Sequence, residues 1–328
     1  MHLDRRTFLA ASAAMLSFPA DAAIAPLAPG ARIAPDREEM IPVEGGRVYV
    51  RINGDLTGPR PPIVFAHGGP GSSHWYWLNA TALADERAVI LYDQLDSGRS
   101  DHPGDPANWT VARFVSELPT IAHALGITRW HMLGASWGGT LALEYAARRP
   151  AELASVIIQS PLVSTDIWIR DANRLKDAMP PETRRLLYLC DTPGAASQAE
   201  CEAATDAFYA RHVRRFDPPA AVQAYKDALP RSFSPDIYNH MWGRAEFTAS
   251  GTLKDYDGRA LLKHLDGKRT LFVAGEHDEA IPSTIAAFAE EAGAAFREVP
   301  DAGHTAMNDN PEAYLAILRP WLAAHDQG

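Results

Sequence analysis

Short apolar runs recur along the chain, separated by stretches with apolar residues at helical spacing. The first, residues 48–52, follows a Glu44-Gly45-Gly46 turn and is predicted to be the second strand of a hairpin. Runs without alternation are typical of strands buried on both faces of a parallel sheet. The pattern therefore predicts the α/β class, with a mostly parallel sheet flanked by helices. The later runs are residues 62–66, 88–92, 130–133, 156–158, 270–274 and 296–299.

Between residue 161 and about residue 256 this alternation stops. Helical patterns rich in Arg, Asp and Ala follow one another without a clear buried strand, and prolines such as Pro193 and Pro230 interrupt them. We interpret this region as a helical insertion that lies over one end of the sheet. The predicted organisation is a core in two parts, residues 26–161 and 257–328, with a helical cap at 162–256 inserted after the sixth strand.

The N-terminus has the composition of an export signal. Arg5 and Arg6 precede an apolar stretch from Phe8 to Phe18, which is too short to span a bilayer as a helix. The arginine pair followed by x-Phe-Leu resembles a twin-arginine signal, which directs folded proteins across the inner bacterial membrane. We expect a periplasmic or secreted protein and exclude residues 1–25 from the fold; a mobile amphipathic N-terminus is the alternative.

The amino-acid composition limits the classes of molecule that this protein is expected to bind. The net charge of −10 and the lack of Lys/Arg clusters argue against nucleic acid and against an anionic membrane surface, so we expect a small molecule or another protein as partner. No Cys/His cluster has metal-ligand spacing, and neither a metal nor another cofactor is predicted. Cys190 and Cys201 lie close together near a predicted turn; they form a disulfide in an oxidising compartment or remain as two unpaired thiols.

Ser136 is the candidate nucleophile. Residues 134–138 fit G-x-S-x-G between an apolar run at 130–133 and a helical pattern at 140–148. Small residues permit a sharp strand-to-helix turn that exposes the serine hydroxyl. Serine beside glycine also occurs in ordinary turns, but the flanking strand and helix favour a nucleophile.

A serine hydroxyl needs a base held in one tautomer by a third group. The predicted strand at 270–274 ends before Asp278, and the one at 296–299 ends before His304. Carboxyl ends of neighbouring parallel strands meet at one edge of a sheet. We therefore predict that His304 is the base for Ser136 and that Asp278 orients it.

Four other polar residues fit catalytic roles less well. His277 adjoins the acid and is expected to point elsewhere, and Asp301 lies on the base's own loop as a turn or cap residue. His131 lies within a predicted strand, as a core histidine with its hydrogen bonds satisfied. His74 could line the leaving-group side, but a surface position at a helix start is the preferred interpretation.

The chemistry also needs two N–H donors for the developing oxyanion. The sequence HGGPG at 67–71 directly follows the apolar run at 62–66, and its glycines let the backbone approach a substrate. We predict the backbone amides of Gly69 and Trp137 as the donors. Glycine loops also bind phosphates, but the lysine of a Walker loop and the spacing of a dinucleotide site are missing.

Six motifs follow one another in chain order: HGGPG at 67–71, DQLDSGRS at 93–100, GASWGG at 134–139, GRAEF at 243–247, GEHDE at 275–279 and AGH at 302–304. Together they resemble the proline iminopeptidases, including the tricorn-interacting aminopeptidases, which are serine peptidases of the α/β-hydrolase fold. The resemblance implies that fold and removal of an N-terminal residue, often proline. It also implies that two carboxylates hold the substrate's free amine, here Glu246 and Glu279; a prolyl ammonium offers two N–H donors to them.

The sequence departs from the family pattern at two places. Asp96 replaces a usual glycine; aspartate tolerates left-handed backbone, and we expect it to add a carboxylate near the pocket mouth. Arg244 and Ala245 replace a usual proline-polar pair before Glu246. Candidates for the side-chain pocket are the cap aromatics Trp168, Tyr238 and Trp242.

The resulting expectation is an exported serine aminopeptidase that acts on a short peptide or an aminoacyl amide, with proline favoured. An L-amino-acid amidase or esterase and an acyltransferase use the same acyl-enzyme and remain open. A carboxylesterase or lactonase without amine recognition is the alternative from another class, and a non-enzymatic binding protein is disfavoured by the complete set of site residues. The sequence leaves the oligomeric state open.

Overall fold

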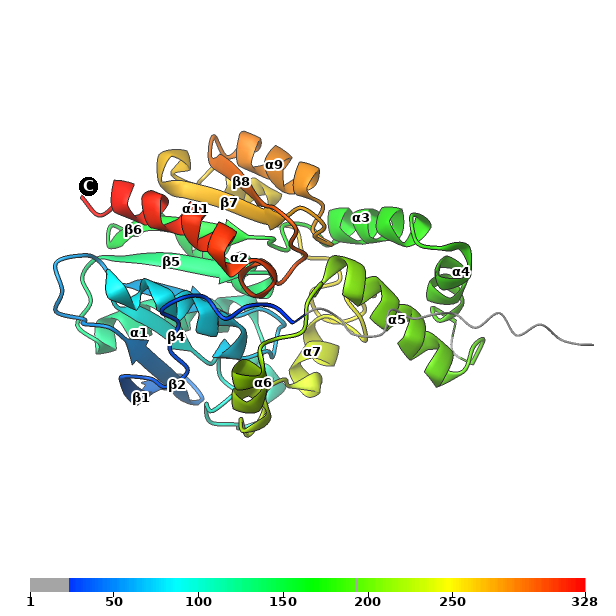
Figure 1. The fold of residues 1–328 in the computed structure, drawn as a ribbon, viewed down its shortest axis with the longest axis horizontal. Coiled ribbons are helices and arrows are strands. Elements are labelled where there is room, and N and C mark those ends of the chain that lie inside the picture. Colours follow the sequence, from blue (N-terminus) through cyan, green and yellow to red (C-terminus); the bar gives the residue numbers. More distant parts are fainter. Residues whose placement is uncertain (1–23, 193, 328) are drawn as a thin grey trace, which may run out of the picture.

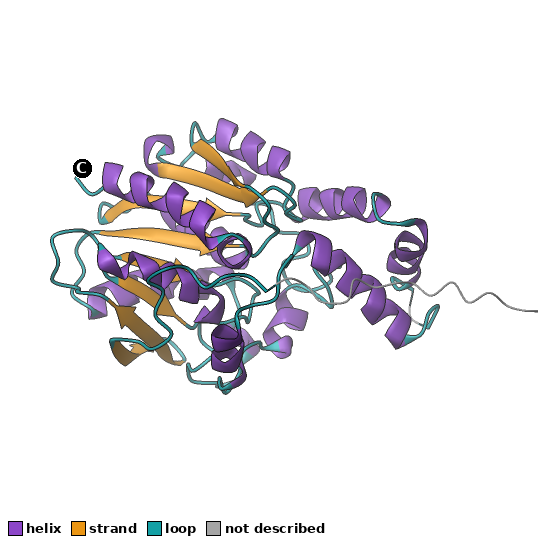
Figure 2. Cartoon of the chain, viewed as in Figure 1, coloured by secondary structure: helices purple, strands orange, loops and turns teal. Residues whose placement is uncertain are grey.

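A computed structural model describes residues 24–192 and 194–327. Eight strands form one sheet in the order β1-β2-β4-β3-β5-β6-β7-β8, antiparallel up to the β2–β4 pair and parallel from there on (Figures 1 and 2). The predicted hairpin, the predicted strands and the α/β class are confirmed. The strands are β1 (Arg37–Val43), β2 (Gly46–Asn53), β3 (Ile63–Ala66), β4 (Val89–Tyr92), β5 (Trp130–Ala135), β6 (Leu153–Gln159), β7 (Thr270–Gly275) and β8 (Ala295–Val299).

Helices cover both faces of the sheet, which is why its central strands are buried throughout and mostly apolar. In β3, Val64 and Ala66 face one layer, and Ile63 and Phe65 face the other. The first layer contains α1 (Val111–Ala124), α2 (Trp137–Ala146), α8 (Arg259–Leu262) and α9 (Pro282–Glu291). The second contains η1 (His74–Asp85), α10 (Ala306–Asp309) and α11 (Pro311–Ala324). Two short 3₁₀ helices are η2 (Pro106–Asn108) and η3 (Gly267–Arg269).

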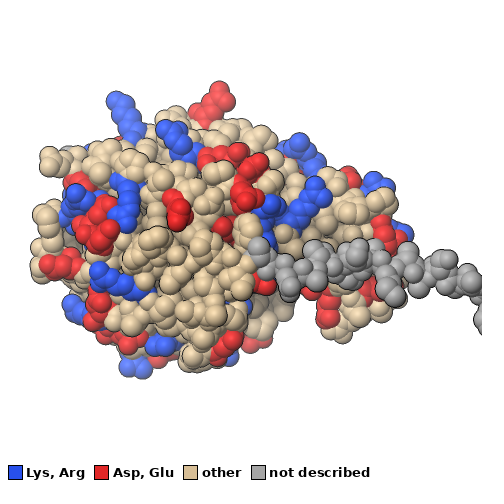
Figure 3. Space-filling view, in the orientation of Figure 1, with Lys and Arg blue, Asp and Glu red and all other residues tan. Residues whose placement is uncertain are grey.

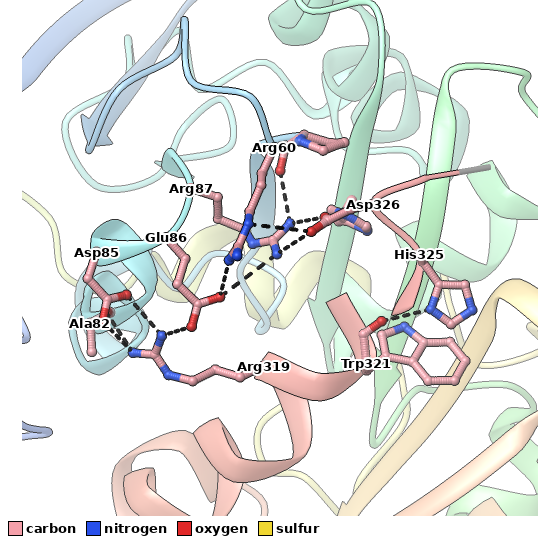
Figure 4. Close-up of polar contacts among 11 residues, drawn as sticks. Arg60, Ala82, Asp85, Glu86, Arg87, Arg319, Trp321, His325 and Asp326 are labelled. Atoms are coloured by element: carbon pink, nitrogen blue, oxygen red, sulfur yellow. Dashed lines mark hydrogen bonds and ion pairs between the residues drawn. The ribbon is translucent and has the colours of Figure 1, made fainter. Parts of the chain in front are cut away.

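Ion pairs fasten α11 at the amino ends of the strands (Figure 4). Arg319 of α11 pairs with Glu86 and lies 2.9 Å from Asp85, and the buried Arg87 lies 2.6 Å from Asp326. Asp326 also lies 3.2 Å from Nε2 of a buried histidine of β5. These contacts close the end of the sheet opposite the candidate site.

That histidine is His131, and the prediction of a core histidine is confirmed. Its Nδ1 lies 2.8 Å from Oγ of Ser155, so both ring nitrogens have partners. Burial lowers the pKa of His131 to about 4, which keeps the ring neutral inside the sheet.

The chain between β6 and α8 forms the helices that we call the cap helices. In Figure 1, α3, α4 and α5 lie beyond one end of the sheet. Cys190 and Cys201 form a disulfide that joins the end of α4 to α5, with 5.7 Å between the Cα atoms, so the interpretation as unpaired thiols is wrong. The cap helices are α3 (Thr165–Asp177), α4 (Pro181–Leu189), α5 (Gln198–His212), α6 (Ala220–Asp227) and α7 (Pro235–Met241).

Charges are mixed over the surface. On the face shown in Figure 3, basic and acidic side chains are interspersed, without a continuous basic patch. Within residues 24–192 and 194–327, no helix has both the length and the apolar character of a membrane span. The predicted export signal falls almost entirely on residues 1–23, which lie outside the described residues.

Candidate active site

Ser136 lies at the carboxyl end of β5, on the turn into α2. Its φ of 56° and ψ of −122° place it in backbone space that side-chain-bearing residues rarely adopt. A Cβ on Gly134 would overlap with the carbonyl of Gly138, and a Cβ on Gly138 would lie 2.7 Å from the carbonyl oxygen of His67. The glycines of this motif are therefore required sterically, and the turn presents Ser136 to a cavity of about 480 Å³.

Asp278 holds His304 in one orientation. Asp278 follows β7 and His304 follows β8, and Oδ1 of Asp278 lies 2.7 Å from Nδ1 of His304. The buried carboxylate also accepts hydrogen bonds from Ser160 Oγ (2.5 Å), from the Ala280 amide (2.9 Å) and from the Gly275 amide (3.1 Å). Nδ1 of His304 donates to Asp278, so Nε2 is the ring nitrogen left for Ser136.

The other ring nitrogen of His304 is available. Nε2 has no hydrogen-bond partner among the described residues, and His304 lines the same cavity as Ser136. His277 does not line this cavity; its Nε2 lies 4.0 Å from Glu276. Asp301 occupies a turn with φ of 53° and does not line the cavity either. Of the candidates for acid and base, His304 lines the cavity with Ser136, and Asp278 contacts His304.

The two predicted amide donors lie on the two loops that meet at Ser136. Within the described part of the chain, neither the Gly69 amide nor the Trp137 amide has a hydrogen-bond partner, and both residues line a small cavity with Ser136. The amide of Gly68 donates to Tyr76 Oη, and a Cβ on Gly68 would lie 3.1 Å from Cβ of Ser136. The loop backbone therefore packs directly against the serine, with two unengaged N–H groups nearby.

Gln94 joins these two loops, a role that sequence reasoning missed. Its side chain donates to the carbonyl of His67 (2.8 Å) and accepts from the indole N–H of Trp137 (2.9 Å). Its backbone amide donates to Nε2 of His67 (2.9 Å), and burial lowers the pKa of His67 to about 4. The ring is neutral and can accept this bond. The signal in the sequence was the Asp-Gln pair at the end of β4, at the same edge of the sheet.

Two carboxylates lie at the site. Glu279 is buried beside Asp278, and its Oε1 lies 3.8 Å from Nε2 of His304 without a hydrogen-bond partner among the described residues. Glu246 follows α7; its amide donates to Tyr209 Oη (3.1 Å), and its carbonyl accepts from the Trp168 indole (2.8 Å). These backbone contacts hold Glu246 at the wall that the cap shares with the Ser136 cavity.

The electrostatics of the site favour a cation. Burial raises the pKa of Glu279 well above its usual value, and the charge of Glu246 raises it further. Burial also raises the pKa of Glu246. For His304, burial alone lowers the pKa, but Asp278 and Glu279 outweigh it and raise the pKa to about 10. A positively charged group placed between these carboxylates would offset their mutual repulsion.

Two cavities open at Ser136. The larger has a volume of about 480 Å³ and extends along α5. The smaller is mostly apolar, and Trp168 and Trp242 line it together with Glu246, as expected for candidates of the side-chain pocket. Tyr238 is buried and lines neither cavity, so its prediction as a pocket residue is wrong. The ring of Trp168 packs edge-on against Trp242 (6.1 Å between centroids) and against His304 (5.8 Å).

Two further expectations are wrong. His74 begins η1, as expected for a helix start, but it is neither a surface nor a cavity residue: it is fully buried, and its nitrogens lie 2.8 Å from Asp93 and 2.8 Å from Tyr225 Oη. Asp96 adopts the expected positive φ, 65°, but its carboxylate does not reach the pocket mouth. It is buried and accepts from Trp109 Nε1 (2.8 Å) and from an amide of its own loop (2.8 Å), because a buried carboxylate needs such donors.

Comparison with known proteins identifies the class and then the family. Residues 61–311 match the alpha/beta hydrolase fold family, so the chain is an α/β hydrolase. It is 37% identical over 286 residues to a proline iminopeptidase of Heyndrickxia coagulans, a match that covers 87% of this chain and 98% of the relative. For a proline iminopeptidase of Levilactobacillus brevis the identity is 35% over 297 residues, with 89% and 98% covered.

Comparison with solved structures agrees with the sequence relatives. The crystal structure of the proline iminopeptidase of Mycobacterium smegmatis superposes with a TM-score of 0.79 at 34% identity, covering 88% of this chain and 99% of that one. The chain belongs to the proline iminopeptidase family, and the resemblance seen in its motifs is confirmed.

Proposed function

We propose that the protein is a serine aminopeptidase that releases an N-terminal residue, preferably proline, from short peptides or aminoacyl amides. The observation that carries this proposal is the position of Glu279 and Glu246. Glu279 is buried within 4 Å of the reactive nitrogen of His304, and Glu246 lines both cavities at Ser136. A hydrolase acting on neutral substrates gains nothing from buried carboxylates there, whereas an aminopeptidase uses them to bind the substrate ammonium.

The reaction proceeds through an acyl-enzyme. Ser136 Oγ attacks the carbonyl carbon of the first residue, and Nε2 of His304 accepts the hydroxyl proton and delivers it to the departing amine. Asp278 keeps the ring in place and stabilises the imidazolium. The amides of Gly69 and Trp137 donate to the oxyanion, where one such donor contributes about 10²–10³ in rate. Water then repeats the sequence on the ester and frees Ser136.

The free amine of the substrate both binds to the two glutamates and makes His304 able to act as a base. In the empty site, Asp278 and Glu279 raise the pKa of His304 to about 10, which leaves the base protonated at neutral pH. A bound ammonium donates to Glu246 and Glu279 and offsets their charge. The pKa of His304 then falls, and the ring becomes a base when the correct substrate is present.

The test compares a chromogenic prolyl anilide with its N-acetylated counterpart. We expect kcat/KM for the free amine to exceed that for the acetylated compound by about 10²-fold, because two charge-assisted hydrogen bonds are lost on acetylation. Ser136→Ala should remove turnover of both compounds while the circular dichroism spectrum stays unchanged. Equal rates for the two compounds would contradict the amine site, and residual turnover by Ser136→Ala would contradict the nucleophile.

We also propose that the protein is exported through the twin-arginine route. The arginine pair Arg5 and Arg6 supports this, as does the Cys190–Cys201 disulfide, because such bonds persist in oxidising compartments. A fusion of residues 1–25 to a fluorescent reporter should reach the periplasm of a bacterial host. The double variant Arg5→Lys, Arg6→Lys should stay in the cytoplasm; a wild-type fusion that stays there would contradict the proposal.

A further inference from the structure

The larger cavity extends from Ser136 past His304 to the loop that follows α5, where Arg214 lines it. Resting on the proposed aminopeptidase function, we propose that this cavity receives the departing peptide and that Arg214 binds the peptide's C-terminal carboxylate. The preferred substrates are then short peptides with a free C-terminus.

The position of Arg214 relative to His304 supports this assignment. The departing amine takes its proton from Nε2 of His304, so the leaving peptide must lie on the side of this residue. The amide of His304 donates to the carbonyl of His212 (3.0 Å), and the amide of Thr305 donates to that of Val213 (2.9 Å). The chain that leads into Arg214 therefore runs along the loop of His304, and Arg214 lies on the leaving-group side.

Arg214 has an uncommitted guanidinium. It forms no ion pair and no side-chain hydrogen bond with any of the described residues, whereas its neighbour Arg215 pairs with Asp301 at 2.9 Å. Asp206 and Asp217 also line the cavity, but neither forms an ion pair with Arg214 within the described part of the chain. A planar guanidinium with free N–H donors is the side chain best suited to a carboxylate.

A second cationic side chain, Lys226, lies beside a residue that lines the same cavity. Nζ of Lys226 lies 4.7 Å from the ring centre of Trp75, which lines the cavity. Burial lowers the pKa of Lys226, and the charge of Arg214 lowers it further, so the two cations share one local field. The site thus has Glu246 and Glu279 where the substrate ammonium binds and the uncommitted guanidinium of Arg214 farther along the cavity, where Asp206 and Asp217 also line it. An ammonium site and a free guanidinium in one cavity are complementary to a zwitterion.

The volume fits the same substrate class. About 480 Å³ is within the range of about 300–1,000 Å³ that is typical of small-molecule sites, so the cavity holds a short leaving segment and no folded chain. A peptide whose carboxylate reaches Arg214 would gain a charge-assisted bond that the corresponding C-terminal amide cannot form.

The test measures kcat/KM for Pro-Ala, Pro-Ala-Ala and Pro-Ala-Ala-Ala, each as the free acid and as the C-terminal amide, with prolyl anilide as reference. At the length that spans the cavity, we expect the acid to be preferred by about tenfold at low ionic strength. Arg214→Gln should bring this ratio close to one, and Arg214→Lys should retain part of it. Arg211→Gln is the matched control: Arg211 is exposed near the end of α5, three residues before Arg214, but does not line the cavity, so the ratio and the anilide rate should persist.

The outcomes separate the two proposals. If the wild type hydrolyses prolyl anilide but treats acids and amides equally at every length, the carboxylate site is overturned and the aminopeptidase proposal stands. If a folded Arg214→Gln keeps the acid preference, the assignment to Arg214 is overturned. If neither the anilide nor any prolyl peptide is hydrolysed, the aminopeptidase proposal fails and the carboxylate site fails with it. Thermal melting of each variant establishes that it is folded.

Discussion

The edge of the sheet and the cap build one site by different physical means. At the sheet edge, backbone geometry and buried hydrogen bonds hold the reacting groups. Ser136 lies on a turn with no space for a side chain on Gly138, and Asp278 accepts hydrogen bonds from one hydroxyl and two amides besides its contact with His304. Little in this region can shift without moving a strand.

The outer helices of the cap, α4 and α5, are held more loosely. A small apolar cluster, one disulfide and partly exposed ion pairs stabilise them, whereas α3 and α7 contribute Trp168 and Tyr238 to the main core. One of these pairs is Asp191 with Arg244 at 3.1 Å, two residues before Glu246. Exposed pairs of this kind contribute about 0–1 kcal/mol. The sheet edge therefore supplies the chemistry, and the cap, through Glu246, shares the selectivity with Glu279 of the sheet edge, so damage to the cap should be separable from damage to the reacting groups.

The strongest test of this division is Gly138→Ala. The added Cβ would overlap with the carbonyl of Ala66 and lie 2.7 Å from that of His67, so the turn must move. We expect kcat to fall by about 10³-fold or more, since the oxyanion donors move with the turn. The control is Gly126→Ala, at a positive φ of 70° with nothing within 4 Å; it should cost about 1 kcal/mol of unfolding free energy and leave kcat intact. Full activity in Gly138→Ala would refute a rigid turn.

Glu246→Gln tests the cap side. The substitution keeps the side-chain size and removes the charge, so we expect the preference for free over acetylated amines to fall about 10- to 100-fold. Labelling of Ser136 by a fluorophosphonate, which needs no amine, should continue. Glu202→Gln on the exposed face of α5 is the matched control. Loss of labelling in Glu246→Gln would show that the cap also positions the nucleophile.

The double variant Cys190→Ser, Cys201→Ser should loosen the cap alone. Closing a loop of this length contributes up to about 3 kcal/mol in the chain-entropy description, and its loss should increase proteolysis and amide exchange in α4 and α5. Labelling of Ser136 should remain close to that of the wild type. If exchange in β5 rises equally, the two regions unfold together and the division is wrong.

The smallest expected effect is a shift in pH dependence. Asp278 and Glu279 raise the pKa of His304 to about 10, and the base must be deprotonated to act. Glu279→Gln removes one of these charges, so the pKa of His304 falls, and the rise of fluorophosphonate labelling with pH should move to lower pH. Glu276→Gln, an exposed carboxylate on the same loop, should leave the profile in place. A shift to higher pH in Glu279→Gln would exclude the charge effect.

Local patterns predicted much of this architecture, and long-range contacts account for the rest. The strands and the turn of Ser136 follow from apolar runs and steric limits within a few residues. Ser160, which donates to Asp278, was missed because 118 residues separate the two; its place directly after β6 at the same sheet edge was the available signal. His74 was misplaced because its partner Tyr225 lies 151 residues away on α6.

In the cap, even more of the structure depends on contacts that local sequence patterns do not indicate. Its helical patterns were recognised, but α5 buries only Ala204, Phe208 and His212, which is too narrow an apolar face to indicate what the helix packs against. Tyr238 was assigned to the pocket from residue type alone, and its actual position in the core depends on how α7 packs. The amine-binding role of Glu246 and Glu279 was predicted from the family resemblance, because the two residues are far apart in the sequence and no local pattern indicates that they share a site.

Gln94 has a consequence for protein engineering. One amide side chain couples the loop of His67 to the indole of Trp137, so the two backbone donors keep their spacing through a residue that lines neither cavity. In mutant libraries that vary the glycine loop and the turn of Ser136 independently, most combinations will not keep the two backbone donors at the required spacing. To graft this site onto another hydrolase scaffold, residues 67–71, 93–94 and 134–139 must be transferred together.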